Sequence, residues 1–250
     1  MATETVVAAL LASVRAGAWL AIAPPFSSRA IPMPVKALLS VALGLPAVAT
    51  TGQSVPPLEV APLLSAVALQ VVVGAGLGFL CYLVLVAVQS AGDLLDVFGG
   101  FSLAFAFDPL MQTGNAVLGR FYQMTALALL LASGAYLVVL GGFLRSYQAI
   151  ALDGGLNLTT LADVLQHGVG QMLLAALQIA APLLAVLFLA DVALGLLTRV
   201  APALNAFALG FPFKILLTLL LVSAGFIALP GVVTDLARQA GALIVQVAQR

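Results

Sequence analysis

The chain of 250 residues is 63% hydrophobic and only 7% charged, whereas a soluble domain carries about 25% charged residues. Nine basic and nine acidic side chains are too few to cover a soluble surface of this size, and they leave a formal net charge of zero. No basic patch with interleaved aromatic residues is present, so the sequence has no electrostatic footprint for a nucleic-acid partner. We therefore predict an integral membrane protein of several hydrophobic helices.

Proline, glycine and charged residues divide the first half of the chain into apolar runs. We expect a first helix over about 5–23, which Pro24 and Pro25 end because proline cannot continue the backbone hydrogen bonds. A second helix is expected over about 35–49 and a third over about 63–97. The third is much longer than the roughly 20 residues that cross a bilayer, so it must tilt, break or project beyond it.

The second half continues with three more hydrophobic segments. We predict helices over about 117–146, 164–200 and 213–229, which makes about six in all. Proline-containing residues 202–212 are expected to form the connector before the last of these segments. We find no fixed-period repeat, and we predict one all-α domain over residues 1–250.

The C-terminal segment has a different pattern. Within 231–250, apolar residues recur near helical spacing and polar residues fill the other positions, which is typical of an amphipathic helix. Such a helix suits a membrane interface or a partner helix. Docking as a surface helix on its own domain is an equally good interpretation.

The segment 99–115 is apolar but irregular. It reads GGFSLAFAFDPLMQTGN, and its glycines and Pro109 interrupt regular structure. Irregular backbone at membrane depth is tolerated only where it is buried in protein or lines a cavity. Bulky side chains on such a loop can close a pore by excluding water. An ordinary re-entrant or interfacial loop explains the pattern equally well.

Ionisable residues inside the predicted helices need a physical account, because burying one in a bilayer costs at least ~2.5 kcal/mol. Arg15 lies one turn before Trp19, so we expect its guanidinium over the indole. Asp93 and Asp96 share one helix face. They suit either a proton path or a structural lock between helices or subunits, and the shortage of other midplane acids favours the lock.

Two further pairs of residues point to helix packing. Asp191 and Arg199 are eight residues apart, too far for a pair within one helix, so each should find a partner on another helix or subunit. Gly74 and Gly78 form a G-x-x-x-G pattern, which favours close approach of helices.

No residue pattern for chemistry is evident. The chain has one histidine, His167, and one cysteine, Cys81, which cannot make a zinc site of the usual ligand sets. No nucleophile elbow or phosphate-binding loop is present. We predict no catalytic, cofactor-binding or metal-binding residue.

Three segments of the chain resemble one protein family. The first holds Arg15, Pro24, Phe26, Ile31-Pro32 and Val35-Lys36. The second reads Gly100-x-Ser102-x-Ala104 and ends in Asp108-Pro109. The third and most specific reads Asp191-x-x-Leu194-Gly195-Leu196-x-x-Arg199-x-x-Pro202-x-x-Asn205-x-Phe207-x-x-Gly210-x-Pro212-x-Lys214. Together they resemble the FliR family, the R subunit of the flagellar type III export gate, which is related to the T subunit of injectisomes.

The resemblance implies a partnership and a location. In that family the R subunit joins several P and Q subunits in a gate through which unfolded flagellar proteins pass. We therefore expect those partners, the B and A subunits of the export apparatus, and a multi-pass position in the bacterial inner membrane at the flagellar basal body. The loop after the long third helix helps to plug the family's closed pore.

The resemblance assigns the plug to the segment as a whole, because Gly100, Ser102, Ala104, Asp108 and Pro109 match the family's frame whereas the aromatic positions do not match its pattern one for one. The plug residues expected here are Phe101, Phe105, Phe107, Asp108, Pro109 and Met111. The residues expected to serve assembly are Arg15, Asp93, Asp96, Asp191, Arg199, Asn205, Pro212 and Lys214. We predict a non-enzymatic subunit of the flagellar export gate. The alternatives are an injectisome T subunit and a stand-alone transporter of small molecules or ions.

Overall fold

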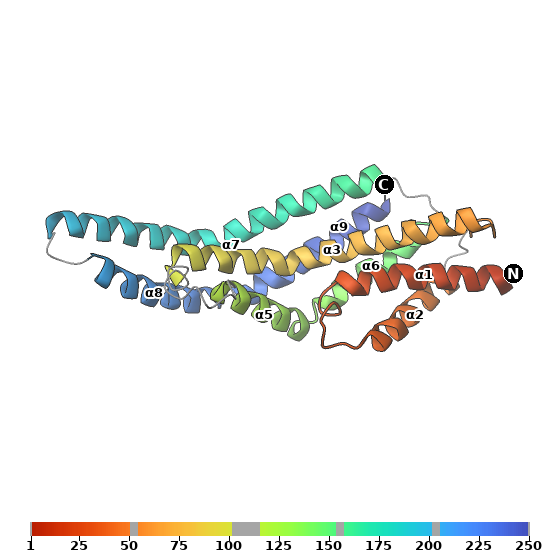
Figure 1. The fold of residues 1–250 in the computed structure, drawn as a ribbon, viewed down its shortest axis with the longest axis horizontal. Coiled ribbons are helices and arrows are strands. Elements are labelled where there is room, and N and C mark those ends of the chain that lie inside the picture. The colour runs from red at the N-terminus through yellow and green to blue at the C-terminus, as the bar shows by residue number, and fades with distance from the viewer. Residues whose placement is uncertain (1, 51–54, 102–115, 154–157, 202–205, 250) are drawn as a thin grey trace. The chain divides into compact units, whose positions relative to one another are not determined.

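A computed structural model describes residues 2–50, 55–101, 116–153, 158–201 and 206–249 (Figure 1). Within these residues all regular structure is helical. The helices are α1 (Ala2–Ile22), α2 (Met33–Thr50), α3 (Val60–Phe98), α5 (Val117–Ala132), α6 (Tyr136–Ala149), α7 (Leu158–Val200), α8 (Ala206–Gly225) and α9 (Leu229–Gln249).

The helices confirm the predicted class, a polytopic helical membrane protein. Three of them, α1, α3 and α7, are long and apolar enough to cross a membrane. Two bent pairs, α5 with α6 and α8 with α9, raise the number to as many as five if each pair is one span. The overlong third segment of the sequence is one helix of 39 residues, and α7 has 43 residues.

The single helix predicted over 117–146 is wrong. The structure interrupts it at 133–135, between α5 and α6. Gly134 takes a φ of 71°, a left-handed conformation that costs other residues about 1–2 kcal/mol. An isolated glycine in an apolar run does not by itself predict a helix break, because glycine is common in membrane helices.

The connector predicted over 202–212 is also wrong in part, since Pro212 lies inside α8. Proline removes one backbone hydrogen bond from a helix, but neighbouring helices and local adjustment tolerate this loss in membrane proteins. Pro182 likewise lies inside a helix, α7. The start of α7 at Leu158, earlier than predicted, adds a polar first turn that resembles a loop in sequence.

The helices divide into two compact units, which we describe separately. Unit 1 comprises residues 1–84, 130–170 and 234–250, and unit 2 comprises residues 85–129 and 171–233. Unit 1 therefore holds α1, α2 and α6, together with the first part of α3 and most of α9. Unit 2 holds α5, α8, the end of α3 and most of α7.

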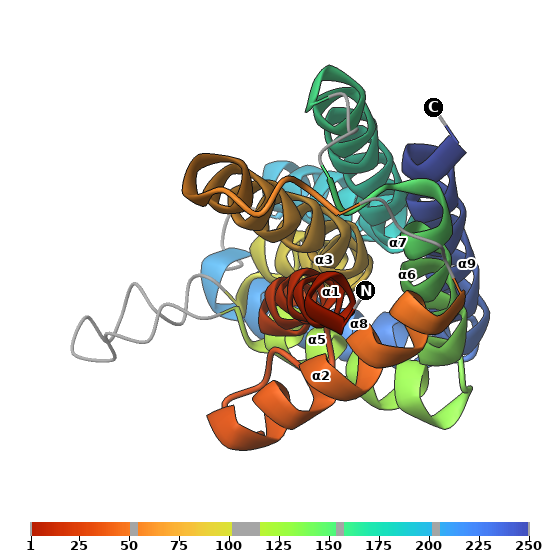
Figure 2. The same ribbon diagram turned by 90° about the vertical axis from the view of Figure 1, so that its right-hand side faces the viewer.

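The core of unit 1 depends on close contact between α1 and α3. A Cβ atom added at Gly74 would lie 2.3 Å from the carbonyl oxygen of Arg15, and one at Gly78 would lie 3.0 Å from that of Trp19. Only glycine allows the backbones to approach so closely, so the predicted packing role of this pair is confirmed. α2 packs against the other side of α1, as the end-on view in Figure 2 shows.

Aromatic side chains fill the space between α1 and α6. The Trp19 ring stacks on Phe143 with a centroid distance of 4.5 Å, and Phe143 meets Tyr147 edge to face at 5.3 Å. All three side chains are buried. Such pairs add about 0.5–1.5 kcal/mol each beyond the burial of their area.

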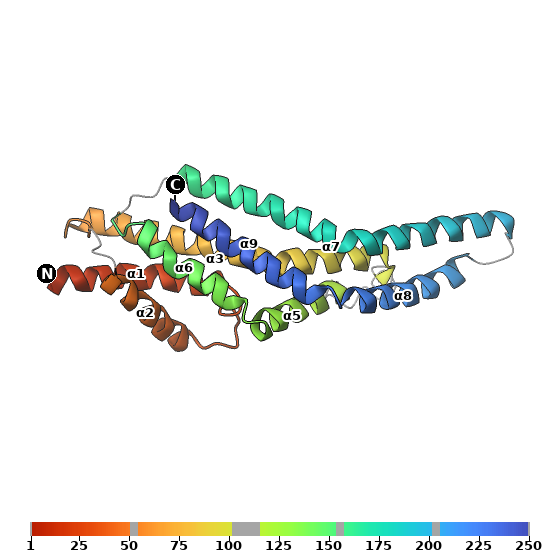
Figure 3. The same ribbon diagram turned by 180° about the vertical axis from the view of Figure 1, so that it is seen from behind.

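The amphipathic C-terminal helix, α9, docks on its own chain. Leu236, Ala237, Ala240 and Ile244 on its apolar side are buried. Figure 3 shows α9 alongside α6, and a Cβ atom at Gly142 of α6 would lie 3.3 Å from the carbonyl oxygen of Gly241. Of the two interpretations of this segment, surface docking on its own domain is therefore the one observed.

Candidate functional site

The segment predicted to act as a plug is mostly outside the described residues. Phe105, Phe107, Asp108, Pro109 and Met111 all fall within 102–115, of which nothing structural is described. The flanks of this segment, the end of α3 and the start of α5, belong to unit 2 and are well packed. They form the candidate functional site, which we call the loop root.

Asp96 forms one part of the loop root. Its side chain is only 2% exposed, and its Oδ2 accepts a hydrogen bond of 3.0 Å from the backbone N–H of Gly119. The carboxylate also lies against the backbone amides of Val117 and Leu118. These are the first residues of α5, whose N–H groups have no partners within the helix. Asp96 therefore caps α5 from another helix and places its charge at the positive end of the helix dipole.

Close packing of α3 against α5 supports this cap. A Cβ atom at Gly92 would lie 2.7 Å from the Cα atom of Gly119, so the backbones touch at this crossing. Asp93 lies beside the same glycine, because a Cβ at Gly119 would collide with its carboxylate. The hydrogen bond of Asp96 favours the interpretation of this acid as a structural lock. Asp93 makes no hydrogen bond among the described residues.

The other flank of the segment packs against α8. Gly99 is buried, and a Cβ atom there would lie 2.7 Å from the hydroxyl oxygen of Thr218. Gly100 has a φ of 85°, a turn that favours glycine, and it faces the ring of Phe211. Phe101 follows as a half-buried residue, the one member of the predicted plug that the structure describes. Sequence reasoning missed Thr218, which is one of only two hydroxyl residues in the apolar helix α8.

A second polar site of unit 2 joins α7 to α8. Lys214 Nζ lies 2.8 Å from Asp191 Oδ1 and donates a hydrogen bond of 2.9 Å to Oδ2. The lysine side chain is 19% exposed and the aspartate 44%. The expectation that Asp191 finds a partner on another helix is therefore confirmed, and the partner is within the chain.

The other assembly candidates of this motif are not brought together. Arg199 is exposed and makes no ion pair among the described residues. Pro212 is an exposed helical residue, and Asn205 lies outside the part of the chain that the structure describes.

Arg15 of unit 1 lies at a buried site that sequence reasoning anticipated only in part. The residue is 0% exposed. Its Nε donates to Gln70 Oε1 at 2.6 Å, and its two terminal nitrogens donate to the carbonyl oxygens of Ser146 and Ile150 at 3.2 and 2.9 Å. These carbonyls lie at the C-terminus of α6, where the helix dipole favours a cation.

The predicted contact between Arg15 and Trp19 is wrong. The guanidinium carbon lies 4.7 Å from the centroid of Tyr147, while Trp19 stacks on Phe143. The carbonyls at the end of α6 attract the guanidinium more strongly than an indole does, because each accepts a hydrogen bond from a charged donor. The missed partner, Gln70, is the one amide in the apolar run 66–73, and that isolation is a usable signal.

The described residues contain no group of three or more His, Cys, Asp or Glu side chains placed to hold a metal ion. The polar side chains at the loop root and around Arg15 bind backbone atoms, and those at Asp191 bind a lysine. These arrangements hold helices together.

Comparison with known proteins agrees with this picture of a helical membrane component. The family described as "Bacterial export proteins, family 1" matches residues 6–240. The chain is 32% identical to the flagellar biosynthetic protein FliR of Escherichia coli over 219 residues, which cover 84% of this chain and 81% of that protein. It is 33% identical to FliR of Bacillus subtilis over 156 residues, or 61% of this chain and 60% of that protein.

An injectisome protein is also similar. The Yop proteins translocation protein T of Yersinia pestis is 29% identical over 147 residues, which cover 58% of this chain and 56% of that protein. The flagellar match from Escherichia coli is thus the more extensive of the two. On the family match and the extent of this similarity, the chain belongs to family 1 of the bacterial export proteins, the family of the FliR proteins.

Proposed function

We propose that this chain is a non-enzymatic subunit of the flagellar type III protein export gate, where it helps to form and plug the pore for unfolded flagellar proteins. Its family makes it a component of the flagellar export apparatus. The observation that carries the finer proposal is the loop root. The described residues that flank this Phe-rich segment make buried, closely packed contacts, as the flanks of a plug fixed at both ends should.

The proposed plug comprises Phe101, Phe105, Phe107 and Met111, in the frame of Asp108 and Pro109. Bulky apolar side chains at a constriction exclude water and so block ions. The cap that Asp96 places on α5 and the contact of Gly99 with Thr218 support this role, because they hold the two flanks of the segment in unit 2.

The proposed partners are the P and Q subunits of the gate, with the B and A subunits of the export apparatus around them. An uncovered surface supports such partners. Only 22% of the most apolar stretch of α7 is buried, against 67% in α3. We place the whole chain, acting as one export-gate domain, in the inner membrane at the flagellar basal body.

An ion-leak experiment tests the plug. The full chain carrying Phe101→Ala, Phe105→Ala and Phe107→Ala is assembled with its gate partners, and ion flux is measured in proteoliposomes. The triple variant should leak, because the constriction loses its apolar seal. Phe121→Ala is the control for loss of an aromatic ring, since this half-exposed ring lies on α5, outside the substituted segment in the sequence. An assembled triple variant as tight as the wild type would contradict the plug.

An injectisome T subunit is the second candidate, and the similarity to the Yersinia pestis protein favours it. A complementation experiment separates the two. The chain should restore motility to a flagellated strain that lacks its R subunit, and it should fail to restore secretion to a strain that lacks an injectisome T subunit. The reverse pattern would replace the flagellar assignment.

A further inference from the structure

A groove runs along unit 1 between α6 and α9. The two helices touch at Gly142 and Gly241, and beside this contact they leave a cavity of about 520 Å³. A cavity of this volume falls within the range of small-molecule sites, about 300–1,000 Å³. Gly141 lies on its floor, and a Cβ atom added there would meet nothing within 4 Å.

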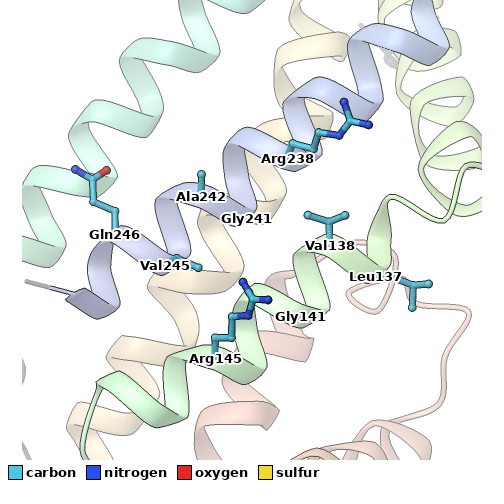
Figure 4. A pocket seen from close by; sticks show the side chains of 10 residues that line it. Leu137, Val138, Gly141, Arg145, Arg238, Gly241, Ala242, Val245 and Gln246 are labelled. Atoms are coloured by element: carbon cyan, nitrogen blue, oxygen red, sulfur yellow. The ribbon is translucent and has the colours of Figure 1, made fainter.

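Most residues that line the groove are apolar, and Arg145, Arg238 and Gln246 are its polar members. Its apolar lining residues are Leu137, Val138, Ala242 and Val245, together with the three glycines of the contact and the floor. Figure 4 shows the apolar lining of the groove, with Leu137 and Val138 on α6 and Ala242 and Val245 on α9. Such a strip of exposed apolar surface suits a hydrocarbon chain, which would remove it from water.

The charged residues of the groove are both cations. Arg145 extends from α6 toward α9, and Arg238 lies on α9 one turn before Gly241 (Figure 4). Arg145 is exposed and makes no ion pair among the described residues. Arg238 contacts Asp235 at 3.2 Å, but both side chains are about two-thirds exposed, so this pair is weak. The lining contains no acidic residue, and the groove therefore favours an anion.

An apolar floor beside two exposed arginines, of which only Arg238 has an acidic neighbour among the described residues, selects an amphiphile with an anionic head. The chain is a membrane protein, and basic pockets between membrane helices bind lipid headgroups. Arginine forms two parallel hydrogen bonds to a phosphate, which suits this group better than a lone point charge would. A free anion would not need the apolar floor.

We propose that the groove binds an anionic phospholipid, with its phosphate on Arg145, Arg238 near the headgroup and an acyl chain over Gly141. Native mass spectrometry of the full chain in mild detergent tests this, with phosphatidylglycerol and phosphatidylcholine added in equal amounts. The wild type should retain the anionic lipid in preference. Arg145→Gln should lower this retention about tenfold, as expected for the loss of one charged bidentate contact.

Three further variants make the test specific. Arg145→Lys keeps the charge and should retain part of the binding. Gly141→Leu fills the groove without a clash at its Cβ and should lower retention of both lipids. Arg120→Gln, an exposed cation of α5 outside the groove, should leave retention unchanged. Thermal unfolding followed by the fluorescence of Trp19, the one tryptophan, verifies that each variant is folded.

Several outcomes would overturn the proposal. Equal retention of the two lipids would remove the role of the arginines. An effect of Arg120→Gln as large as that of Arg145→Gln would show non-specific attraction to net charge. Displacement of the anionic lipid by inorganic phosphate at the same concentration would show a free-phosphate site in place of a lipid site.

Discussion

Arg15 in unit 1 and the Asp191–Lys214 pair in unit 2 both place charge on apolar helices, but their surroundings differ. Arg15 is fully buried, and its hydrogen bonds end on an amide and on backbone carbonyls, with no acidic partner among its hydrogen-bond acceptors. Asp191 and Lys214 neutralise each other, yet the aspartate stays 44% exposed on a helix surface that is largely apolar.

The difference in exposure distinguishes Arg15, a buried charge that holds helices of one chain together, from the partly exposed charges of Asp191 and Lys214. Arg15 is satisfied within the chain and joins α1, α3 and the end of α6. The pair on α7 and α8 stays partly exposed, which would leave it accessible to a neighbour in the proposed assembly. We therefore expect substitution at Arg15 to reduce stability, and substitution at the pair to reduce assembly.

The largest expected effect is that of Arg15→Leu. The change removes the charged donor that Arg15 supplies to Gln70 Oε1 and to the carbonyls of Ser146 and Ile150, and the cost should be about 3 kcal/mol or more. Thermal unfolding in detergent, followed by tryptophan fluorescence, measures it. Arg29→Leu is the control, because Arg29 is exposed in the same unit. Equal loss of stability in the two variants would contradict the claim that the buried contacts of Arg15 stabilise the fold.

A smaller effect is expected from Asp96→Ala, which removes the cap from α5. Loss of a helix N-cap costs about 0.5–2 kcal/mol. Asp96→Asn keeps an acceptor for the Gly119 N–H and should recover most of the stability. Thermal unfolding of the two variants tests the cap. If the asparagine variant is as unstable as the alanine variant, the negative charge matters more than the hydrogen bond.

The smallest effect on stability is expected at the exposed charges of unit 2. Asp191→Leu or Arg199→Leu should change the stability of the isolated chain by less than about 1 kcal/mol, since Arg199 makes no ion pair among the described residues and the partly exposed pair of Asp191 contributes little. Both should lower the yield of assembled gate severalfold. Complex yield on size-exclusion chromatography tests this, with Arg120→Leu as the control. A normal yield in both variants would contradict an assembly role for this motif.

The sequence indicated the helices well because their apolar runs are long and their composition leaves few alternatives. The end of α1 follows from Pro24, as expected. It failed at Gly134 and Pro212 because an isolated glycine or proline can lie inside a membrane helix or break it, and packing decides which occurs.

The sequence predicted which charged residues matter at these sites, but it did not predict the groups that they contact. Arg15, Asp96 and Asp191 were identifiable as charges within apolar helices. Their partners are backbone amides, carbonyls and a lysine 23 residues away, and only the three-dimensional fold brings these together. The guanidinium of Arg15 binds carbonyls at the end of α6 and does not lie over the neighbouring indole. The spacing of residues along one helix does not predict this contact with another helix.

Co-expression with the P and Q subunits tests the central claim most directly. The full chain is extracted gently with these candidate partners, and the product is weighed by native mass spectrometry. The gate assignment predicts a discrete complex that contains this chain with several P and Q copies. A stable monomer or homodimer that ignores both partners would contradict it.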